Sequence, residues 1–262
     1  MIYLINYGNK PYANMQKFQS YTARRFGKVD RVIEYSDIDI LADTEFSSNN
    51  KKILSVKKGN GLFLWKPYII YKTLQSFKDE DVLIYSDVDT IFLDSIYPLI
   101  DLMSQHNKDI LVFDSPNKEY QYTKYNLCED LGLTDESIIT SRQRYASYNL
   151  WRKTDASLSF AKQWLDLCCQ YHLISDDVTS FSPDYRSQFV HNLQDQSIFS
   201  LLTKQNKIEA FRDPSNWGNR LKDEYQNSPY NQILYNGVGN SRKLWYLTHV
   251  FGKQYLKIFK NE

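Results

Sequence analysis

The N-terminal part of the chain alternates short apolar runs with segments whose apolar side chains recur at helical spacing. Residues 2–7 (IYLINY) form an apolar run, and residues 14–26 carry apolar side chains three or four positions apart, up to Gly27. Residues 29–36 form a second apolar run. A strand, a helix and a second strand in this order predict the opening of a parallel sheet of the nucleotide-binding type.

The alternation continues through the middle of the chain. Residues 59–77 contain a helix that Pro67 is well placed to begin, because proline at the first helical position costs no hydrogen bond. Residues 81–93 contain the run VLIY, which is typical of a central strand covered on both faces. The remaining pattern predicts helices at 96–107, 157–172 and 195–204, strands at 109–115 and 144–153, and irregular structure at 117–140 and over most of the chain beyond 175.

Length and composition agree with one α/β domain. The 262 residues, 42% of them hydrophobic and 15% aromatic, suffice for a single core, and 9 Gly and 7 Pro are too few for a flexible linker. We therefore predict one domain over residues 1–262, with a central, mostly parallel sheet flanked by helices. The net charge of +1 does not favour a nucleic-acid partner, and none is expected.

The cysteines and the N-terminal residues bear on the cellular location. Three cysteines, two of them adjacent at Cys168 and Cys169, form neither a disulfide framework nor a zinc-binding spacing, which favours a reducing compartment. The chain lacks the basic start of a signal peptide, and no apolar stretch has the roughly 20 residues of a membrane-spanning helix. We expect a cytoplasmic protein.

The pattern YSDxD occurs twice, at 35–39 and at 85–89. The second copy ends the most apolar strand, and ligands of open α/β sheets bind at the carboxyl ends of strands. In an extended strand Asp87 and Asp89 would point the same way, with Val88 in the core. Without a compensating lysine or arginine beside them, two such carboxylates favour Mg²⁺ or Mn²⁺ as a ligand. The alternative is a solvated turn.

The first copy has two interpretations. Asp37 and Asp39 precede a solvated, helix-like segment, so that they can be a helix cap and a surface charge. Alternatively, Asp37 lies at the end of the second strand, where it would contact a nucleoside while the second copy holds the metal.

Three longer segments carry a family resemblance. Residues 59–70 (GNGLFLWKPYII) are similar to a G-x-G-y-W-x-W-K-P-y-i-i segment, and residues 191–202 (HNLQDQSIFSLL) to an R/H-x-x-D-Q-S-x-x-S-x-L segment. Residues 144–168 resemble the strand and helix between them. With the D-x-D near residue 90, this order is similar to the nucleotide-sugar-dependent glycosyltransferases of the GT-A fold, in particular those of bacterial and viral surface polysaccharides.

The resemblance implies a function and a division of the chain. It implies a metal-dependent transfer of a hexose from a nucleotide-diphosphate sugar, UDP-sugar favoured over GDP-sugar, to a glycan or lipid-linked saccharide acceptor. The pathway would be the synthesis of surface polysaccharide, lipopolysaccharide or capsule. Residues 1–115 would bind the nucleotide sugar and residues 116–262 would form the acceptor side.

The resemblance also assigns donor-binding residues. Mn²⁺ or Mg²⁺ on Asp87 and Asp89 would bridge the two phosphates. Tyr7 and Gly8 would flank the base and Asp37 the base or ribose. Gly61, Trp65 and Lys66 would approach the diphosphate or the donor sugar; the alternative takes Trp65 as core and Lys66 as solvated.

Asp195 and Gln196 are the catalytic candidates. An aspartate near the sugar can deprotonate an acceptor hydroxyl. In related retaining enzymes with a D-Q pair, the carboxylate or amide lies beside the anomeric carbon instead. Asp195 can also cap the helix that follows, and this role does not exclude the others.

The C-terminal residues extend the candidate site. His249 in THVFGK resembles the H-x-x-G element of one retaining GT-A family, whose histidine completes the metal site, and Gly252 and Lys253 would then contact the donor; that family's lysine lies further along. The segment 242–260 mixes basic and aromatic residues. It is compatible with peripheral contact to the inner face of a membrane, but closing the fold is the favoured interpretation.

Three other classes of function agree less well with the sequence. A sugar-phosphate nucleotidyltransferase usually carries a glycine-rich, basic loop after the first strand, which NYGNKPYANM lacks. A non-catalytic carbohydrate-binding protein would suit the 21 Tyr and 5 Trp, but it needs no diphosphate clamp. Phosphohydrolases place a nucleophilic aspartate on the first strand, where IYLINY has none.

Overall fold

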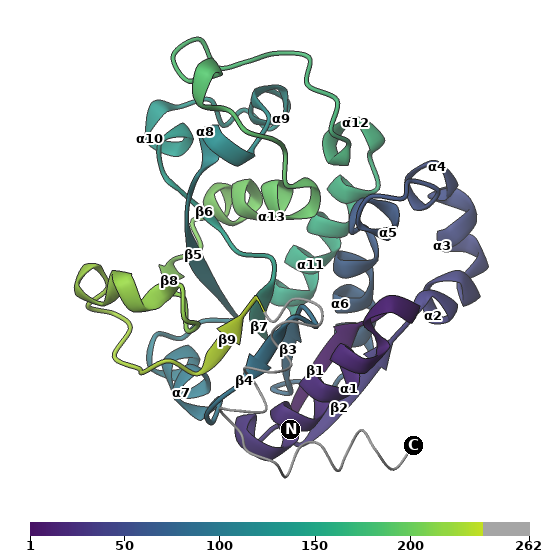
Figure 1. The fold of residues 1–262 in the computed structure, drawn as a ribbon, viewed down its shortest axis with the longest axis vertical. Helices are drawn as coiled ribbons and strands as arrows, with labels where there is room; N and C mark the ends of the chain where they lie inside the picture. Colours follow the sequence, from purple (N-terminus) through teal and green to yellow (C-terminus); the bar gives the residue numbers. More distant parts are fainter. Residues whose placement is uncertain (238–262) are drawn as a thin grey trace.

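The computed structural model describes residues 1–237. A mixed seven-stranded sheet in the order β2-β1-β3-β7-β5-β6, with β8 paired to β5, forms its centre, and a two-stranded sheet of β4 and β9 lies beside it (Figure 1). The strands are β1 (Ile2–Tyr7), β2 (Arg31–Tyr35), β3 (Val82–Ser86), β4 (Thr90–Phe92), β5 (Ile110–Lys118), β6 (Arg142–Arg144), β7 (Tyr148–Arg152), β8 (Ala210–Phe211) and β9 (Leu234–Asn236).

Most strands of the large sheet run in one direction. β1 is parallel to both β2 and β3, and β5 is parallel to β8. β7 is antiparallel to both β3 and β5, and β6 is antiparallel to β5. β7, which follows β5 and β6 in the sequence, therefore joins β1, β2 and β3 to the rest of the sheet. The carboxyl ends of β1, β2 and β3 meet at one edge.

Helices cover both faces of the sheet. The core on one face includes α6, α11 and α13, and the core on the other includes α7. The helices are α1 (Ala13–Thr22), α2 (Asp37–Ala42), α3 (Thr44–Asn49), α4 (Lys51–Leu54), α5 (Gly59–Leu62), α6 (Trp65–Ser76), α7 (Tyr97–Gln105), α8 (Glu119–Tyr122), α9 (Tyr125–Asp130), α10 (Glu136–Ile139), α11 (Asp155–Cys168), α12 (Tyr171–Ile174) and α13 (Gln194–Gln205).

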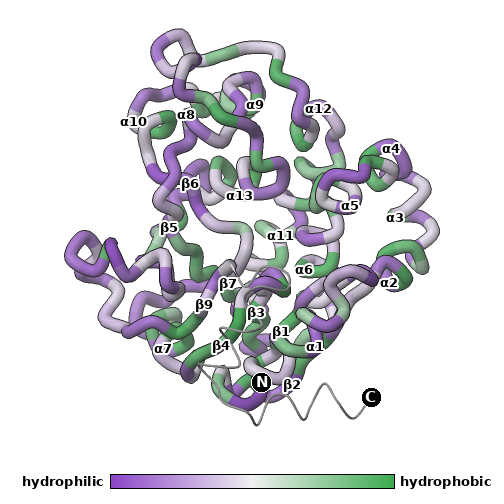
Figure 2. The backbone as a smooth tube through the Cα atoms, in the orientation of Figure 1, coloured by the Kyte–Doolittle hydropathy of each residue, from purple (hydrophilic) through white to green (hydrophobic). Residues whose placement is uncertain are grey.

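Alternation along the strands distributes side chains between the two cores. In β1, Leu4 belongs to the core with α7 and the next residue, Ile5, to the core with α6. Figure 2 shows the hydrophobic residues concentrated on the central strands. None of the helices within residues 1–237 is long and apolar enough to span a bilayer.

The predicted elements differ from the structure in several places. Residues 117–140, predicted to be irregular, contain the short helices α8, α9 and α10, and the helix predicted at 157–172 is divided between α11 and α12. The predicted strand at 81–93 is interrupted at residues 87–89 by a turn between β3 and β4. The strand predicted at 144–153 is divided between β6 and β7. α6 begins at Trp65, so Pro67 is its third residue rather than its first; the third position also needs no intrahelical N–H partner.

Candidate functional site

A cavity of about 410 Å³ opens at the carboxyl ends of β1 and β3. A second cavity of about 300 Å³ lies at the opposite edge of the sheet, where β5 begins. Open α/β sheets bind ligands at the carboxyl edge, so the first cavity is the candidate site. It is lined by Tyr7, Asn9, Tyr12, Lys57, Gly59, Asn60, Phe63, Trp65, Asp87, Val88 and Asp89.

Both carboxylates of the second YSDxD copy line this cavity, but not as predicted. They belong to a turn, in which Thr90 N donates to Asp87 O over 3.0 Å, and not to an extended strand. Asp87 N donates to Ser147 O over 2.7 Å, which ties the turn to the start of β7. Val88 is 8% exposed and packs in a core with α1, as expected.

Lys66 corrects the prediction that the two carboxylates have no compensating cation. Its Nζ lies 3.3 Å from Asp87 Oδ1 and 3.1 Å from Asp195 Oδ2, and its side chain is 4% exposed. Burial lowers the pKa of Lys66, but the charges of Asp195 and Asp87 outweigh it and hold the pKa above its ordinary value. The interpretation of Lys66 as a solvated side chain is therefore wrong. The buried ammonium joins the D-x-D turn to α13.

The two catalytic candidates on α13 have different surroundings. Asp195 is buried behind Lys66, and burial raises its pKa to about 6, although the charge of Lys66 opposes the rise. It is the second residue of α13, whose N-cap is Leu193. Gln196 donates to Gln143 Oε1 over 2.8 Å and accepts from Ala146 N over 3.1 Å, so its amide holds the segment between β6 and β7.

Three residues form a polar cluster beside the cavity, and two of them, Tyr7 and Asn60, line it. Tyr7 Oη and Asn60 Nδ2 both donate to Asp37 Oδ1. Burial, with the hydrogen bond to Asp37, raises the pKa of Tyr7, so its hydroxyl remains a donor. The ring of Tyr7 stacks on Trp65 at 3.9 Å, and Trp65 is buried, as its core interpretation predicts. Asp37 does not itself line the cavity, but it is hydrogen-bonded to Tyr7 and Asn60, which do.

The other acid of the first copy has a structural role. Asp39 Oδ2 accepts from Ser36 N over 2.8 Å and from Ser36 Oγ over 2.6 Å, which is a capping box at the start of α2. This agrees with the cap interpretation for Asp39.

The cavity wall contains a left-handed turn that the sequence pattern did not reveal. Residues 59–63 all have positive φ, and three of the five are not glycine. Trp65 Nε1 donates to Gly59 O over 2.9 Å. A Cβ on Gly61 would lie 3.0 Å from Leu54 Cα. The two glycines were the available signal; Asn60 and Phe63, which this turn places in the cavity wall, were missed.

Gly8 lies beside the same site. Its N donates to Tyr35 O over 3.0 Å, and a Cβ there would meet the side chain of Gln16 at 2.8 Å. Close packing between β1 and α1 therefore requires glycine at this position.

The cavity contains ligands suitable for a divalent metal. Asp87 and Asp89 supply hard oxygen ligands in its lining, and phosphate oxygens of a ligand would complete such a site. Within residues 1–237 no cluster of three or more His, Cys, Asp or Glu could hold a metal without a ligand. The donor set therefore fits a metal shared with a phosphate. His249, Gly252 and Lys253 lie outside the described residues.

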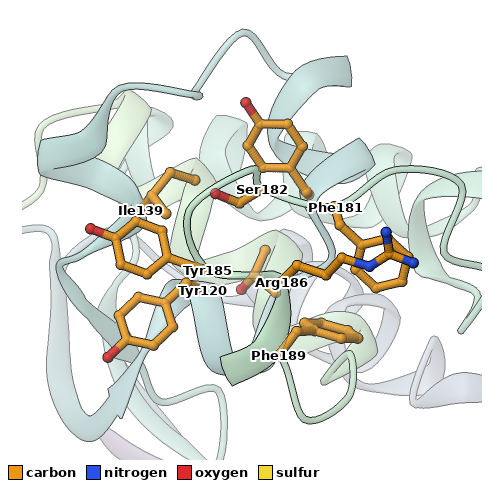
Figure 3. A pocket seen from close by; sticks show the side chains of 9 residues that line it. Tyr120, Ile139, Phe181, Ser182, Tyr185, Arg186 and Phe189 are labelled. Atoms are coloured by element: carbon orange, nitrogen blue, oxygen red, sulfur yellow. The ribbon is translucent and has the colours of Figure 1, made fainter.

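An aromatic cluster lies between α8, α10 and the segment 181–189 (Figure 3). Tyr120 stacks on Tyr185 at 4.6 Å, and the guanidinium of Arg186 lies 4.7 Å from the ring of Phe181. The space between these side chains is only about 10 Å³, roughly the minimum for one water. The cluster packs the segment 181–189 against α8 and α10 and is not a ligand site.

Comparison with known proteins supports the fold. No family model and no curated protein matches the sequence. The solved structure of mouse xyloside xylosyltransferase 1, apo form, is similar with a TM-score of 0.51 and 12% identity, over 92% of this chain and 99% of that chain. The galactosyltransferase LgtC, with donor and acceptor sugar analogues, aligns over 91% and 87% of the two chains at 13% identity and a TM-score of 0.44. The first likeness confirms the predicted GT-A class of α/β fold.

Proposed function

We propose that the protein is a metal-dependent glycosyltransferase that moves a hexose from a nucleoside-diphosphate sugar to a glycan acceptor. The observation that carries the proposal is the set of side chains around the 410 Å³ cavity. The Asp87 and Asp89 carboxylates line it together with the stacked rings of Tyr7 and Trp65 and with Asn60, and both Tyr7 and Asn60 are hydrogen-bonded to Asp37. A xylosyltransferase with a similar fold supports the same reaction class.

The two groups of side chains suit the two parts of a nucleoside diphosphate: the carboxylates would hold the metal at the diphosphate, and the Tyr7–Asp37–Asn60 cluster would contact the nucleoside. Asp37 is an acceptor for ribose hydroxyls or base N–H groups, and Asn9 Oδ1 is buried without a partner among residues 1–237 while lining the same cavity. Uracil and guanine both carry ring N–H donors that fit these acceptors, so the preference for a UDP-sugar over a GDP-sugar rests on the family resemblance alone. Gly8 and Gly61 remain proposed donor-binding residues, although a Cβ on either would meet Gln16 or Leu54 and neither residue lines the cavity.

The metal ligands in this proposal are Asp87 and Asp89, with His249 as a third ligand on sequence grounds alone. A bound Mn²⁺ or Mg²⁺ would neutralise charge on the departing diphosphate. Lys66 keeps a positive charge beside Asp87 in a buried position, where electrostatic interactions are strong. Gly252 and Lys253 are proposed donor contacts on the same sequence grounds.

Asp195 and Gln196 are the proposed catalytic residues, although neither lines the cavity in this structure. Asp195 has a pKa of about 6, in the range where a carboxyl group can take a proton from an acceptor hydroxyl near neutral pH. Gln196, held by Gln143 and the backbone of Ala146, would fix the orientation of α13 relative to β6 and β7. Residues 116–262 would supply the acceptor side, and surface-polysaccharide synthesis in the cytoplasm remains the proposed setting.

The decisive experiment measures ligand-induced thermal stabilisation. UDP, GDP, CMP and their common sugars are compared, each with Mn²⁺ and with EDTA, on the wild type and on Asp89→Ala. A ligand at about 100 times its Kd stabilises the native state by about 2.7 kcal/mol. We expect a shift with UDP that requires Mn²⁺ and disappears in Asp89→Ala, followed by Mn²⁺-dependent hydrolysis or transfer of a UDP-sugar.

Two results would contradict the proposal. Stabilisation by free sugars but by no nucleotide would instead favour a carbohydrate-binding protein. Release of pyrophosphate from a nucleoside triphosphate and a sugar phosphate would favour a nucleotidyltransferase. As a matched control, Asp39→Ala removes a carboxylate of the same pentapeptide pattern from the α2 cap and is expected to leave the Mn²⁺ requirement intact.

A further inference from the structure

Three amide side chains form a buried chain between α1 and the ends of β1 and β3. Gln16 Nε2 donates to Asn6 Oδ1 over 3.0 Å, and Asn6 Nδ2 donates to Gln19 Oε1 over 2.8 Å. Gln16 is 7% exposed, and Asn6 and Gln19 are fully buried. The core beside them is apolar, with Met15, Phe18, Val88 and Ile91. Buried amides are costly unless their hydrogen bonds are made. The protein groups that these three amides bind therefore account for their presence in the core.

The two ends of the chain reach two parts of the candidate site. At one end Gln16 Nε2 donates to Tyr35 O over 2.8 Å, at the end of β2 and two residues before Asp37. At the other end Gln19 Nε2 lies 2.5 Å from Asp87 O and 2.7 Å from Thr90 O. Gln19 therefore contacts the backbone of the D-x-D turn on both sides of Val88 and Asp89.

The contacts of Gln19 hold the backbone of the D-x-D turn in place. The carbonyls of Asp87 and Thr90 face a buried amide, and Gln19 Nε2 also lies 3.0 Å from Ser86 Oγ at the end of β3. An apolar side chain in place of Gln19 would leave Thr90 O, among these groups, without this donor. The carboxylates themselves do not touch Gln19, so its effect on them passes through the backbone.

We infer that Gln19 is a positioning residue for the divalent-ion site: it holds the turn so that Asp87 and Asp89 present their carboxylates to one ion. The inference rests on the proposed function. Loss of a group that orients metal ligands typically lowers metal affinity about 10- to 100-fold. The proposed nucleoside contacts, Tyr7, Asp37 and Asn60, are held by hydrogen bonds to one another. The metal-independent part of the UDP affinity should therefore change much less.

The test is titration calorimetry of UDP in Mn²⁺ and in EDTA, with wild type and Gln19→Met. The ratio of the two UDP affinities measures the metal-dependent part of binding. We expect this ratio to fall roughly tenfold in Gln19→Met, while the affinity in EDTA changes less than about twofold. Ser157→Ala is the control, because it removes a buried hydroxyl that donates to Arg152 O over 2.6 Å at the opposite edge of the sheet. It should lower the melting temperature and leave the ratio unchanged.

The outcomes separate the inference from the proposed function. If Gln19→Met does not fold, Gln19→Asn, which retains the amide on a shorter side chain, is expected to lower the ratio in the same direction. In a folded variant, a ratio that stays unchanged would overturn the positioning role, including the case in which the UDP affinity falls equally in Mn²⁺ and in EDTA. The glycosyltransferase proposal would remain in place. A wild type that binds UDP equally in Mn²⁺ and EDTA would overturn the metal-dependent function itself.

Discussion

At the scale of single residues, the centre of the site is the ammonium of Lys66 between two aspartates. The sequence identified Lys66, Asp87 and Asp195 as candidates, because their motifs are local. It could not reveal that the three meet, since they come from α6, the turn after β3, and α13. The side chains of Lys66 and Asp195 are each 4% exposed, so removing either one leaves an uncompensated buried charge, which typically costs about 3–5 kcal/mol.

The raised pKa of Asp195 predicts a pH-dependent difference in stability between the wild type and Asp195→Asn. In the folded protein burial raises this pKa from 3.8 to about 6. The folded state therefore binds the proton more tightly than the unfolded chain, and this contribution to stability is complete below about pH 4 and lost as the pH rises through about 6. Asparagine does not titrate. Urea unfolding at several pH values should show the wild type losing stability relative to Asp195→Asn across this window; parallel curves would contradict the shifted pKa.

At the scale of elements, the sequence located most strands and helices but not the turn over residues 59–63. Periodicity reports which residues are buried, whereas the handedness of this turn depends on tertiary contacts. Leu62 is 2% exposed in the core, and Asn60 is bonded to Asp37. These contacts hold non-glycine residues at positive φ, a conformation that costs about 1 kcal/mol or more for each of them.

Gly61→Ala tests this element, and Gly132→Ala is its matched control. Both glycines have positive φ, but a Cβ on Gly61 would meet Leu54, whereas nothing lies within 4 Å of a Cβ on Gly132. Both variants should lose about 1 kcal/mol from backbone strain. Gly61→Ala should lose more, and it alone should weaken UDP binding, because its turn carries Asn60 and Phe63. Equal unfolding free energies and equal UDP affinities in the two variants would count against this role.

Asp43 illustrates how a short helix is fixed to a long one. Its carboxylate accepts from Phe46 N over 3.0 Å at the start of α3, and from Tyr68 Oη and Lys72 Nζ on α6 over 2.8 and 2.9 Å. The hydrogen bond from Phe46 N, with those from Lys72 and Tyr68, lowers the pKa of Asp43 to about 2.

Asp43→Ala should therefore lower the free energy of unfolding by about 1 kcal/mol at neutral pH, the usual cost of losing an N-cap. Because the pKa is lowered in the folded state, this stabilisation is present above about pH 4 and disappears as the pH falls towards 2. Asp43→Asn keeps the cap and should lose less than Asp43→Ala at neutral pH. Denaturation at pH 7 and at pH 2 measures both effects, and a loss for Asp43→Ala that is as large at pH 2 would be evidence against the carboxylate's role.

At the scale of the whole molecule, β7 makes the two parts of the chain interdependent. It pairs with β3 over Val82–Ser86 on one side and with the start of β5 on the other. An α/β alternation predicts a mainly parallel sheet, and most of the strands agree. The antiparallel insertion of β7 was not predicted, because nothing in the run YNLWR specifies which neighbour it joins or in which direction.

We expect one cooperative unfolding transition for the whole chain, and we expect a fragment of residues 1–115 to remain unfolded on its own. In that fragment β3 would have an unpaired edge and its apolar face towards α11 would be exposed. Circular dichroism and urea unfolding of the fragment and the full chain would check this. A cooperatively folded fragment would instead divide the protein into two domains.

The position of β7 also has a consequence for the order of events during protein synthesis. A ribosome that has just completed β3 must still add residues 87–152 before the strand that closes its edge exists. At about 5–20 residues per second this interval is roughly 3–13 s. For that time the segments of β1, β2 and β3 have no partner to complete their sheet, and their unpaired backbone groups can pair with other chains. Translational pausing within this interval should therefore increase co-translational aggregation more than pausing after residue 152 has left the ribosome. The candidate site should also be among the last parts of the molecule to form.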